Sequence, residues 1–211
     1  PAYAARGAVK RIAAYGAYFF GDGKAPAPEA LTLFLTHRGN LHCKMCGQWG
    51  EGGVSRQANT ENLDTWLSAQ EVMRLTDEVK ASRPSITLFG GEPLLHPQIL
   101  DIAGHIKKSG LHGVMITNGT LLARFAAELV EMGWDELNIS IDGPRDLHEV
   151  IRGLPGIFNK IIEGIDAINA AKKKGGSRLP LINIQCTMSR YNAGHLKELI
   201  DVAQRAWAAS L

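Results

Sequence analysis

Residues 31–46 read Leu-Thr-Leu-Phe-Leu-Thr-His-Arg-Gly-Asn-Leu-His-Cys-Lys-Met-Cys. The first six residues are mainly apolar and predict a strand over Leu31–Thr36. The loop that follows carries Cys43 and Cys46 in a C-x-x-C spacing, with Gly39 four positions before the first cysteine. The chain has three cysteines, which cannot form a disulfide framework, so this spacing favours metal or redox chemistry.

The same pattern, a short apolar run and then a longer segment of helical period, repeats along the chain. We expect strands at Leu31–Thr36, Ser85–Phe89, Gly113–Thr117, Glu136–Ile141 and Leu181–Cys186, and helices near 69–80, 97–109, 121–132, 157–173 and 194–206. Ser68 and Glu71 have the spacing of a capping box. A glycine follows three expected helix ends, at Gly110, Gly133 and Gly175. Such repeated βα units predict one α/β domain built on a parallel sheet.

Three polar motifs each follow an expected strand. They are Gly90-Gly91-Glu92-Pro93, Thr117-Asn118-Gly119 and Ser140-Ile141-Asp142-Gly143-Pro144. In α/β folds ligands bind at the carboxyl ends of the strands, so we expect these motifs to gather beside the cysteine loop. An Asn-Gly pair is also a common turn, which is the alternative interpretation of the second motif.

The cysteine loop and these motifs, in this order, resemble the radical S-adenosylmethionine (SAM) superfamily over nearly the whole chain. With cysteine at position 39 the loop would read C-x-x-x-C-x-x-C, the motif whose three thiolates hold a [4Fe–4S] cluster. The resemblance implies an α/β fold, a partial (β/α)6 TIM-like barrel with a parallel sheet, here truncated before the sixth strand. It also implies an N-terminal helical extension at 1–28 and a core domain at 29–211 that is incomplete at its C-terminus.

The resemblance further implies an enzyme that cleaves SAM reductively to a 5′-deoxyadenosyl radical. That radical would abstract hydrogen from a peptide or small-molecule substrate, and a reductase such as flavodoxin or ferredoxin would supply the electron. Two alternatives stay open: a non-catalytic scaffold that binds SAM or a peptide, and a C-x-x-C thiol oxidoreductase.

By resemblance, the metal-binding and catalytic residues are Cys43 and Cys46, and the cofactor-binding residues are Met45, Gly90, Gly91, Glu92, Pro93, Thr117, Asn118, Ser140, Asp142 and Arg152. The glycines let the backbone approach a ligand closely, and Glu92 adds a charged acceptor for the ammonium group of SAM. Met45 would contact the adenine. Ser140 and Asp142 would face the ribose or the carboxylate, which also suits the planar fork of Arg152. Asn192 matches a further family position, with a helix cap as the alternative.

Gly39 has no side chain to donate, so we expect a cluster that is labile, incomplete or absent. Cys186 is the other thiol, and its position at the end of an apolar strand favours a buried core residue. Zinc held with His37 or His42 and inert thiols are the alternative interpretations of the C-x-x-C pair. The sequence leaves open whether Gly39 is engineered, a sequencing error or natural.

Composition limits the remaining classes. The chain has 211 residues, 45% of them hydrophobic, and a net charge of +2, which gives no electrostatic basis for binding nucleic acid. Unpaired cysteines predict a reducing, cytoplasmic setting. Residues 10–27 loosely resemble a signal peptide, but Gly16 and two tyrosines interrupt the apolar run. We expect instead an amphipathic helix that covers one end of the barrel, and contact of residues 1–20 with a membrane or partner is the less favoured expectation.

Overall fold

The computed structural model describes residues 2–50, 52–54 and 65–205. Its elements are α1 (Ala2–Phe20), β1 (Ala30–Phe34), α3 (Ala69–Val79), η2 (Lys80–Ser82), β2 (Ser85–Phe89), η3 (Pro93–Leu95), α4 (Ile99–Lys108), β3 (His112–Thr117), α5 (Leu122–Glu131), β4 (Glu136–Ser140), α6 (Arg145–Arg152), α7 (Ile157–Gly175), β5 (Leu181–Gln185), η4 (Ala193–His195) and α8 (Leu196–Arg205). The strands form one parallel sheet in the order β1-β2-β3-β4-β5, which confirms the expected α/β fold.

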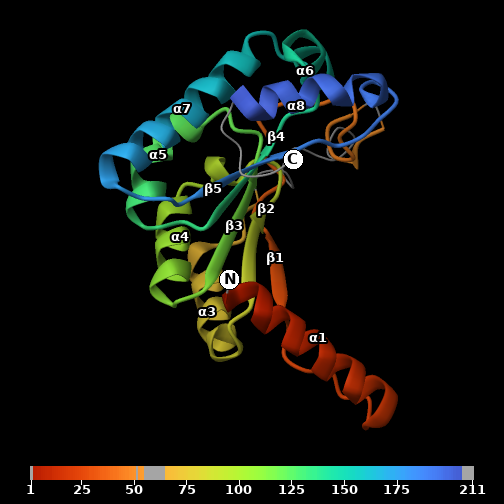
Figure 1. Cartoon of the computed structure of the whole chain (residues 1–211), viewed down its shortest axis with the longest axis vertical. Coiled ribbons are helices and arrows are strands. Elements are labelled where there is room, and N and C mark those ends of the chain that lie inside the picture. The colour runs from red at the N-terminus through yellow and green to blue at the C-terminus, as the bar shows by residue number, and fades with distance from the viewer. Residues whose placement is uncertain (1, 51, 55–64, 206–211) are drawn as a thin grey trace.

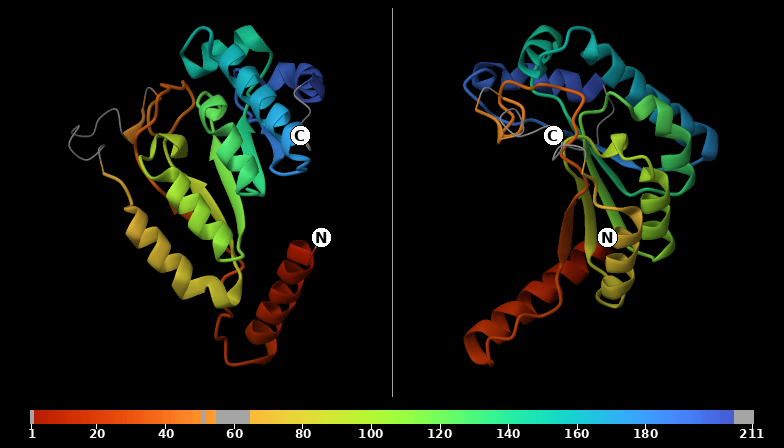
Figure 2. Two further views of the ribbon diagram at one scale, coloured as in Figure 1. Left: turned by 90° about the vertical axis from the view of Figure 1, so that its left-hand side faces the viewer. Right: turned by 180° about the vertical axis from the view of Figure 1, so that it is seen from behind.

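Helices α3, α4, α5 and α7 cover one face of this sheet (Figures 1 and 2). Apolar strand residues on that face, such as Leu88, Met115 and Leu137, are fully buried in the main core. The opposite face is more open, since Thr32 is exposed and Thr87 half-buried. Burial of apolar area on one face holds the layers together and leaves the carboxyl ends of the strands free for loops.

Three strands end slightly earlier than expected. We expected ends at Thr36, Ile141 and Cys186, whereas β1, β4 and β5 end at Phe34, Ser140 and Gln185. The chain leaves the sheet at these points because it turns into the loops of the site. Thr36, for example, forms an isolated antiparallel bridge with Trp66 instead of continuing β1.

Two helical features also differ from expectation. Helix α6 was not expected, because its eight residues give too short an apolar period, yet Ile151 on it is fully buried. Helix α7 includes Gly175, so the left-handed cap is Gly176, with φ of 62°. The capping box at Ser68 is confirmed: its hydroxyl accepts from the Glu71 N–H, and the Glu71 carboxylate accepts from the Ser68 N–H.

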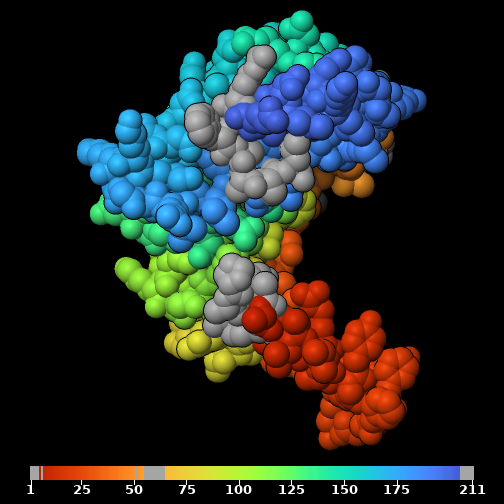
Figure 3. Space-filling view, in the orientation of Figure 1, coloured from red at the N-terminus to blue at the C-terminus, as the bar shows by residue number. Residues whose placement is uncertain are grey.

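Helix α1 lies where a helix was expected and stands out from the rest of the molecule (Figures 1 and 3). Lys10 Nζ donates to the carbonyl oxygens of Pro28 at 3.1 Å and Ser82 at 2.5 Å, beside the amino ends of β1 and β2. Its second half exposes Tyr15, Tyr18, Phe19 and Phe20. The contact with one end of the barrel is therefore made by the first half. None of the described helices combines the length and the apolar content that a membrane span requires.

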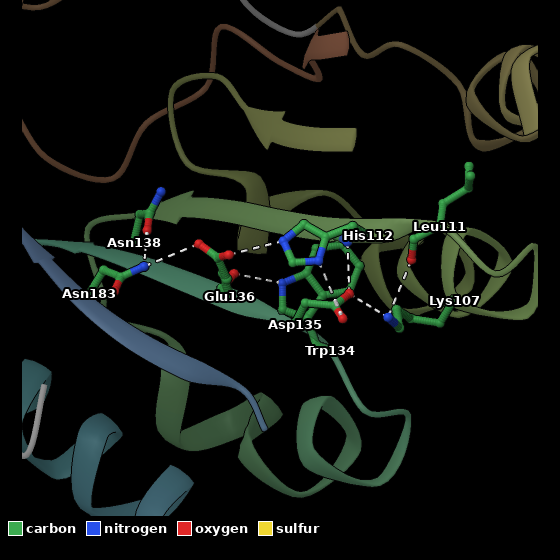
Figure 4. Close-up of polar contacts among 9 residues, drawn as sticks. Lys107, Leu111, His112, Trp134, Asp135, Glu136, Asn138 and Asn183 are labelled. Atoms are coloured by element: carbon green, nitrogen blue, oxygen red, sulfur yellow. Dashed lines mark hydrogen bonds and ion pairs between the residues drawn. The ribbon is translucent and has the colours of Figure 1, made fainter. Parts of the chain in front are cut away.

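A polar cluster joins α4, β3 and β4 at the amino ends of the strands (Figure 4). The Asp135 carboxylate accepts hydrogen bonds from Lys107 Nζ and from the Gly113 N–H, the latter at 2.8 Å. His112 lies between two carboxylates, with Nδ1 3.6 Å from Asp135 and Nε2 3.0 Å from Glu136. Burial disfavours the charged form of Asp135, but its donors outweigh burial and lower its pKa to about 2.

We predict that Asp135→Asn lowers the free energy of unfolding by about 2 kcal/mol at pH 7. The folded pKa lies below the usual 3.8, so the stabilisation is present above pH 3.8 and is lost as pH falls through about 2. Urea unfolding followed by circular dichroism, at a series of pH values from 6 to 2, measures the free energy of unfolding of the present protein and of Asp135→Asn. Their difference should narrow towards acid, and a difference independent of pH would contradict the electrostatic explanation.

The pairing of β1 and β2 continues past their ends as a ladder between two loops. Three backbone hydrogen bonds of 2.8 Å form it, from Leu35 N–H to Phe89 O, from Gly91 N–H to Thr36 O and from Glu92 N–H to Arg38 O. A Cβ on Gly91 would lie 2.1 Å from the Arg38 carbonyl oxygen. A Cβ on Gly90, whose φ is +148°, would lie 2.7 Å from the Thr36 oxygen. Both glycines are therefore required by the approach of the two loops.

We predict that Gly91→Ala lowers the free energy of unfolding by about 3 kcal/mol, because backbone must move away from the new methyl group. Gly104→Ala is the matched control. A Cβ at Gly104, in α4, would meet nothing within 4 Å, so that change should be neutral or stabilising by up to about 1 kcal/mol. Urea unfolding of both variants tests the pair, and equal stabilities would show that the ladder tolerates a side chain.

Candidate functional site

The loops after all five strands line one cavity of about 720 Å³. The sequence-predicted residues on its wall are Cys43, Met45, Cys46, Gly90, Gly91, Thr117, Asn118, Ser140 and Arg152. Three predicted residues, Glu92, Pro93 and Asp142, are buried and are not part of this wall. The structure thus brings the motifs together as expected. The carboxylates of Glu92 and Asp142, however, are buried behind the residues that line the cavity.

The cysteine loop is folded tightly on itself. The Cys46 N–H donates to the Cys43 carbonyl at 3.0 Å, and the Gln48 N–H donates to Cys46 Sγ at 3.4 Å. A hydrogen bond of 2.8 Å from the Lys44 N–H to the Ile151 carbonyl fastens the loop to α6. Cys43 is buried and Cys46 half-buried, so the loop presents one sheltered and one accessible thiol.

Gly39 lies on the same cavity wall as the two cysteines. A Cβ built on it would lie 3.3 Å from Trp49 Nε1 and 3.7 Å from the Gly91 carbonyl carbon. A side chain therefore fits at this position with a shift of a few tenths of an ångström. Position 39, where the family motif has its first cysteine, thus lies on the wall of the site although it carries no donor.

Glu92 connects the loops that follow three strands. Its Oε1 accepts from Thr117 Oγ1 at 2.8 Å and from the Leu94 N–H at 3.1 Å, and its Oε2 accepts from the Asn118 N–H at 2.8 Å. Its backbone N–H belongs to the ladder with Arg38. Complete burial raises the pKa of Glu92, while the three donors favour its charged form. In this structure the carboxylate positions the wall rather than forming it.

Asp142 has the matching role beyond β4. Its Oδ2 accepts from Arg152 Nε at 2.6 Å, and its Oδ1 accepts from the Thr187 N–H at 3.1 Å. Arg152 also points Nη1 at Cys43 Sγ, 3.7 Å away. Burial raises the pKa of the Cys43 thiol, and the Arg152 charge offsets part of that rise. Burial opposes the charge on Arg152, but Asp142 and Cys43 outweigh it and raise the pKa of the guanidinium.

Sequence analysis missed His148, which supports this arrangement from α6. Its Nδ1 accepts the Asp142 backbone N–H at 3.1 Å, and burial lowers its pKa to about 3. The ring is therefore neutral and its other nitrogen carries the proton. No motif marks this histidine, since α6 itself was not expected.

Asn192 does not act as the helix cap that we considered. Its side chain makes no capping hydrogen bond to η4. Instead, Nδ2 donates to the carbonyls of Asp142 at 2.9 Å and Thr187 at 3.0 Å, and lies 3.3 Å from Cys186 Sγ. The fully buried amide therefore joins the loops after β4 and β5.

Cys186 differs from its expected role as a buried core residue. It is half-buried, packs against the core and lines the cavity with Gln185 and Thr187. Its position directly after β5 is the sequence signal for a place on the cavity wall, because the loops after the strands form that wall.

The residues present do not supply three ligands for an iron–sulfur cluster. Cys43, Cys46 and Cys186 line the cavity, and position 39 contributes no donor atom. Throughout residues 2–50, 52–54 and 65–205, no three His, Cys, Asp or Glu side chains are placed to hold a metal ion. The same finding contradicts the zinc site with His37 or His42.

Comparisons with known proteins identify the family. A family model described as "Radical SAM superfamily" matches residues 33–202. The chain is 31% identical over 188 residues to the AdoMet-dependent heme synthase of Methanosarcina barkeri, covering 87% of this chain and 49% of the relative. It is 30% identical over 179 residues to the probable GTP 3′,8-cyclase of Sulfurisphaera tokodaii, covering 83% and 52%. The chain thus spans about half the length of these curated relatives.

The fold also matches solved structures. Streptococcus suis SuiB bound to S-adenosylmethionine superposes with a TM-score of 0.69 at 14% identity, covering 86% of this chain and 39% of that one. SuiB bound to the precursor peptide SuiA gives 0.68 at 16% identity, covering 86% and 38%. These matches confirm the partial TIM-like barrel. With the family model covering most of its length, the chain belongs to the radical SAM superfamily, whose enzymes use a [4Fe–4S] cluster and S-adenosylmethionine.

Proposed function

We propose that this chain is the SAM-binding core of a radical SAM enzyme and that its cluster loop lacks one ligand. The observation that carries the proposal is the convergence of Gly39, both loop cysteines and the Gly90-Gly91 pair on one cavity. In the superfamily the cluster supplies the electron that cleaves SAM. Because the ligands of this chain do not suffice for three-thiolate binding, we derive no reaction step through the cluster.

The proposed contribution of the protein is to bind and orient SAM. The backbone of Gly90 and Gly91 lines the cavity, where its carbonyl groups suit the ammonium group. Arg152 brings a positive charge to the wall, where it attracts the carboxylate of SAM even while Nε stays on Asp142. Ser140, Thr117 and Asn118 add polar groups for the ribose. Met45 would pack against the adenine.

We propose a small-molecule substrate in preference to a peptide. The relatives with about 30% identity are named for heme and GTP, whereas the likeness to peptide-bound SuiB is one of fold. A cavity of about 720 Å³ suits a small ligand beside SAM. A reductase such as flavodoxin or ferredoxin would supply the electron, and the three free cysteines support a cytoplasmic setting.

A second function, a non-catalytic scaffold that binds SAM, is favoured by one observation, the missing donor at Gly39. A thiol oxidoreductase is less well supported. Burial raises the pKa of Cys43, which disfavours the thiolate, and Cys43 and Cys46 lie in a loop rather than at a helix N-terminus.

Anaerobic reconstitution of the protein and its Gly39→Cys variant separates the enzyme from the scaffold. We predict that the variant binds about four irons per chain, the content of one [4Fe–4S] cluster, and that the present protein binds fewer. Under dithionite, the variant alone should release 5′-deoxyadenosine. Both proteins should bind SAM in equilibrium dialysis, because the side chain at position 39 is not itself one of the proposed SAM contacts. Failure of both proteins to bind SAM would reject the proposed function, and binding without cleavage by the variant would favour the scaffold.

A further inference from the structure

Two positively charged side chains meet on the ring of Tyr191, and we call Lys44 and Arg190 the cation pair. The Lys44 ammonium lies 6.0 Å from the ring centroid, and the Arg190 guanidinium carbon lies 5.0 Å from it. Arg190 Nη2 also donates to the Tyr191 hydroxyl at 3.0 Å. Lys44 belongs to the loop after β1 and Arg190 to the loop after β5, and these strands form the two edges of the sheet. The ring therefore brings together charges from opposite edges.

The cation pair belongs to segments that form the wall of the main cavity. Lys44 stands between Cys43 and Met45, which both line the cavity. Arg190 follows shortly after Thr187, another lining residue. Both long side chains therefore start from backbone that lies next to the cavity.

The backbone under both side chains is held in place. The Lys44 N–H donates to the Ile151 carbonyl at 2.8 Å. On the other loop, Asn192 closes the turn that carries Arg190, because its Oδ1 accepts from the Ser189 N–H at 2.7 Å. The side chains of Lys44 and Arg190 are exposed. They can therefore turn towards a ligand while their backbone stays fixed.

The loops around the cavity expose charge of one sign. Their described residues contain two carboxylates, Glu92 and Asp142, which are both fully buried. Arg38, Lys44 and Arg190 in the same loops are exposed. The described loop residues are 35–50, 52–54 and 65–68 after β1, 90–98 after β2, 118–121 after β3, 141–144 after β4 and 186–195 after β5. A cleft with exposed charge of one sign attracts ligands of the opposite sign.

The ring of Tyr191 holds the Lys44 ammonium only weakly. A distance of 6.0 Å is at the outer limit of a cation–π contact. Within the described part of the chain, the ammonium has no carboxylate partner. The neighbouring charge of Arg190 repels it. An anion between the two cations would remove this repulsion and replace the ring contact with charge-assisted hydrogen bonds.

We propose that the cation pair binds an anionic group, a phosphate or a carboxylate, of the small-molecule substrate. This inference rests on the proposed function, because it describes the substrate of the same site. Arg190 supplies a planar fork that matches two anionic oxygens, and Lys44 supplies a compact point charge. No bond forms or breaks in this step. The anionic end of the substrate is thereby directed to the side of the cavity where the loops after β1 and β5 meet.

The test uses two probes, tripolyphosphate and citrate, in isothermal titration calorimetry with SAM present. Lys44→Gln and Arg190→Gln each remove one charge of the pair. We expect each to raise the dissociation constant of the preferred probe about fivefold, the effect of one exposed ion pair. Lys44→Arg keeps the charge and should bind the probe as the present protein does.

Lys173→Gln is the matched control for net charge. It removes an exposed positive charge from the last turn of α7, outside the loops around the cavity. We expect it to change the dissociation constant by less than about twofold, because salt screens charges that lie far from the probe. Far-ultraviolet circular dichroism checks that each variant folds. An equal rise in Lys173→Gln, or no rise in folded Lys44→Gln and Arg190→Gln, would overturn the inference.

The choice between the probes identifies the anionic group. Tighter binding of tripolyphosphate would assign a phosphate, and tighter binding of citrate would assign a carboxylate. Either result supports the inference if it depends on the cation pair.

Equilibrium dialysis with SAM, on the same proteins, separates this inference from the proposed function. If the present protein binds SAM but neither probe, the inference alone fails. If Lys44→Gln or Arg190→Gln loses SAM together with the probes, the pair belongs to the SAM site and the inference is overturned. If the present protein binds a probe but no SAM, the proposed function fails, and the assignment of the anion to its substrate fails with it.

Discussion

The buried carboxylate of Glu92 is the interaction on which the site depends most. Three donors, from the segment after β2, from the last residue of β3 and from the loop after it, converge on its two oxygens, and its own N–H is bonded to the loop after β1. An ionised carboxylate is suited to this position because it has several lone pairs that accept hydrogen bonds and no proton of its own. Desolvation opposes the charge, so the donors must stay in place for the group to remain buried. The geometry of three loops is thereby made interdependent.

Asp142 makes a similar set of contacts beyond the end of β4. It collects Arg152 from α6, the Thr187 N–H from the loop after β5 and, through its backbone, His148 and Asn192. The Arg152 guanidinium then extends the network to Cys43. Two buried acids therefore hold the loops of the site, and both support the cysteine loop, Glu92 through the ladder and Asp142 through Arg152.

The sequence predicts the sheet well because its signals are local. The apolar run Ser85–Phe89 predicts its own strand, and the capping box at Ser68 predicts the helix that follows it. The glycine-rich motif indicates the edge of the sheet where the loops meet. Helix α6 is too short to show a period. The role of Gly91 as a spacer against Arg38 depends on two loops that are distant in the sequence. A contact between segments that are distant in the sequence leaves no residue spacing from which it could be predicted.

The order of the strands has a consequence for how the chain is made. Each strand pairs with its sequence neighbour, so the sheet can grow in the direction of synthesis with modest loop-closure cost at each step. The cysteine loop, however, cannot reach its final conformation as soon as it has been synthesised. Its Lys44 N–H needs the carbonyl of Ile151, and Cys43 needs Arg152. The loop that emerges among the first parts of the chain is thus completed only after α6 has left the ribosome, and a ligand arriving earlier would meet thiols without their final support.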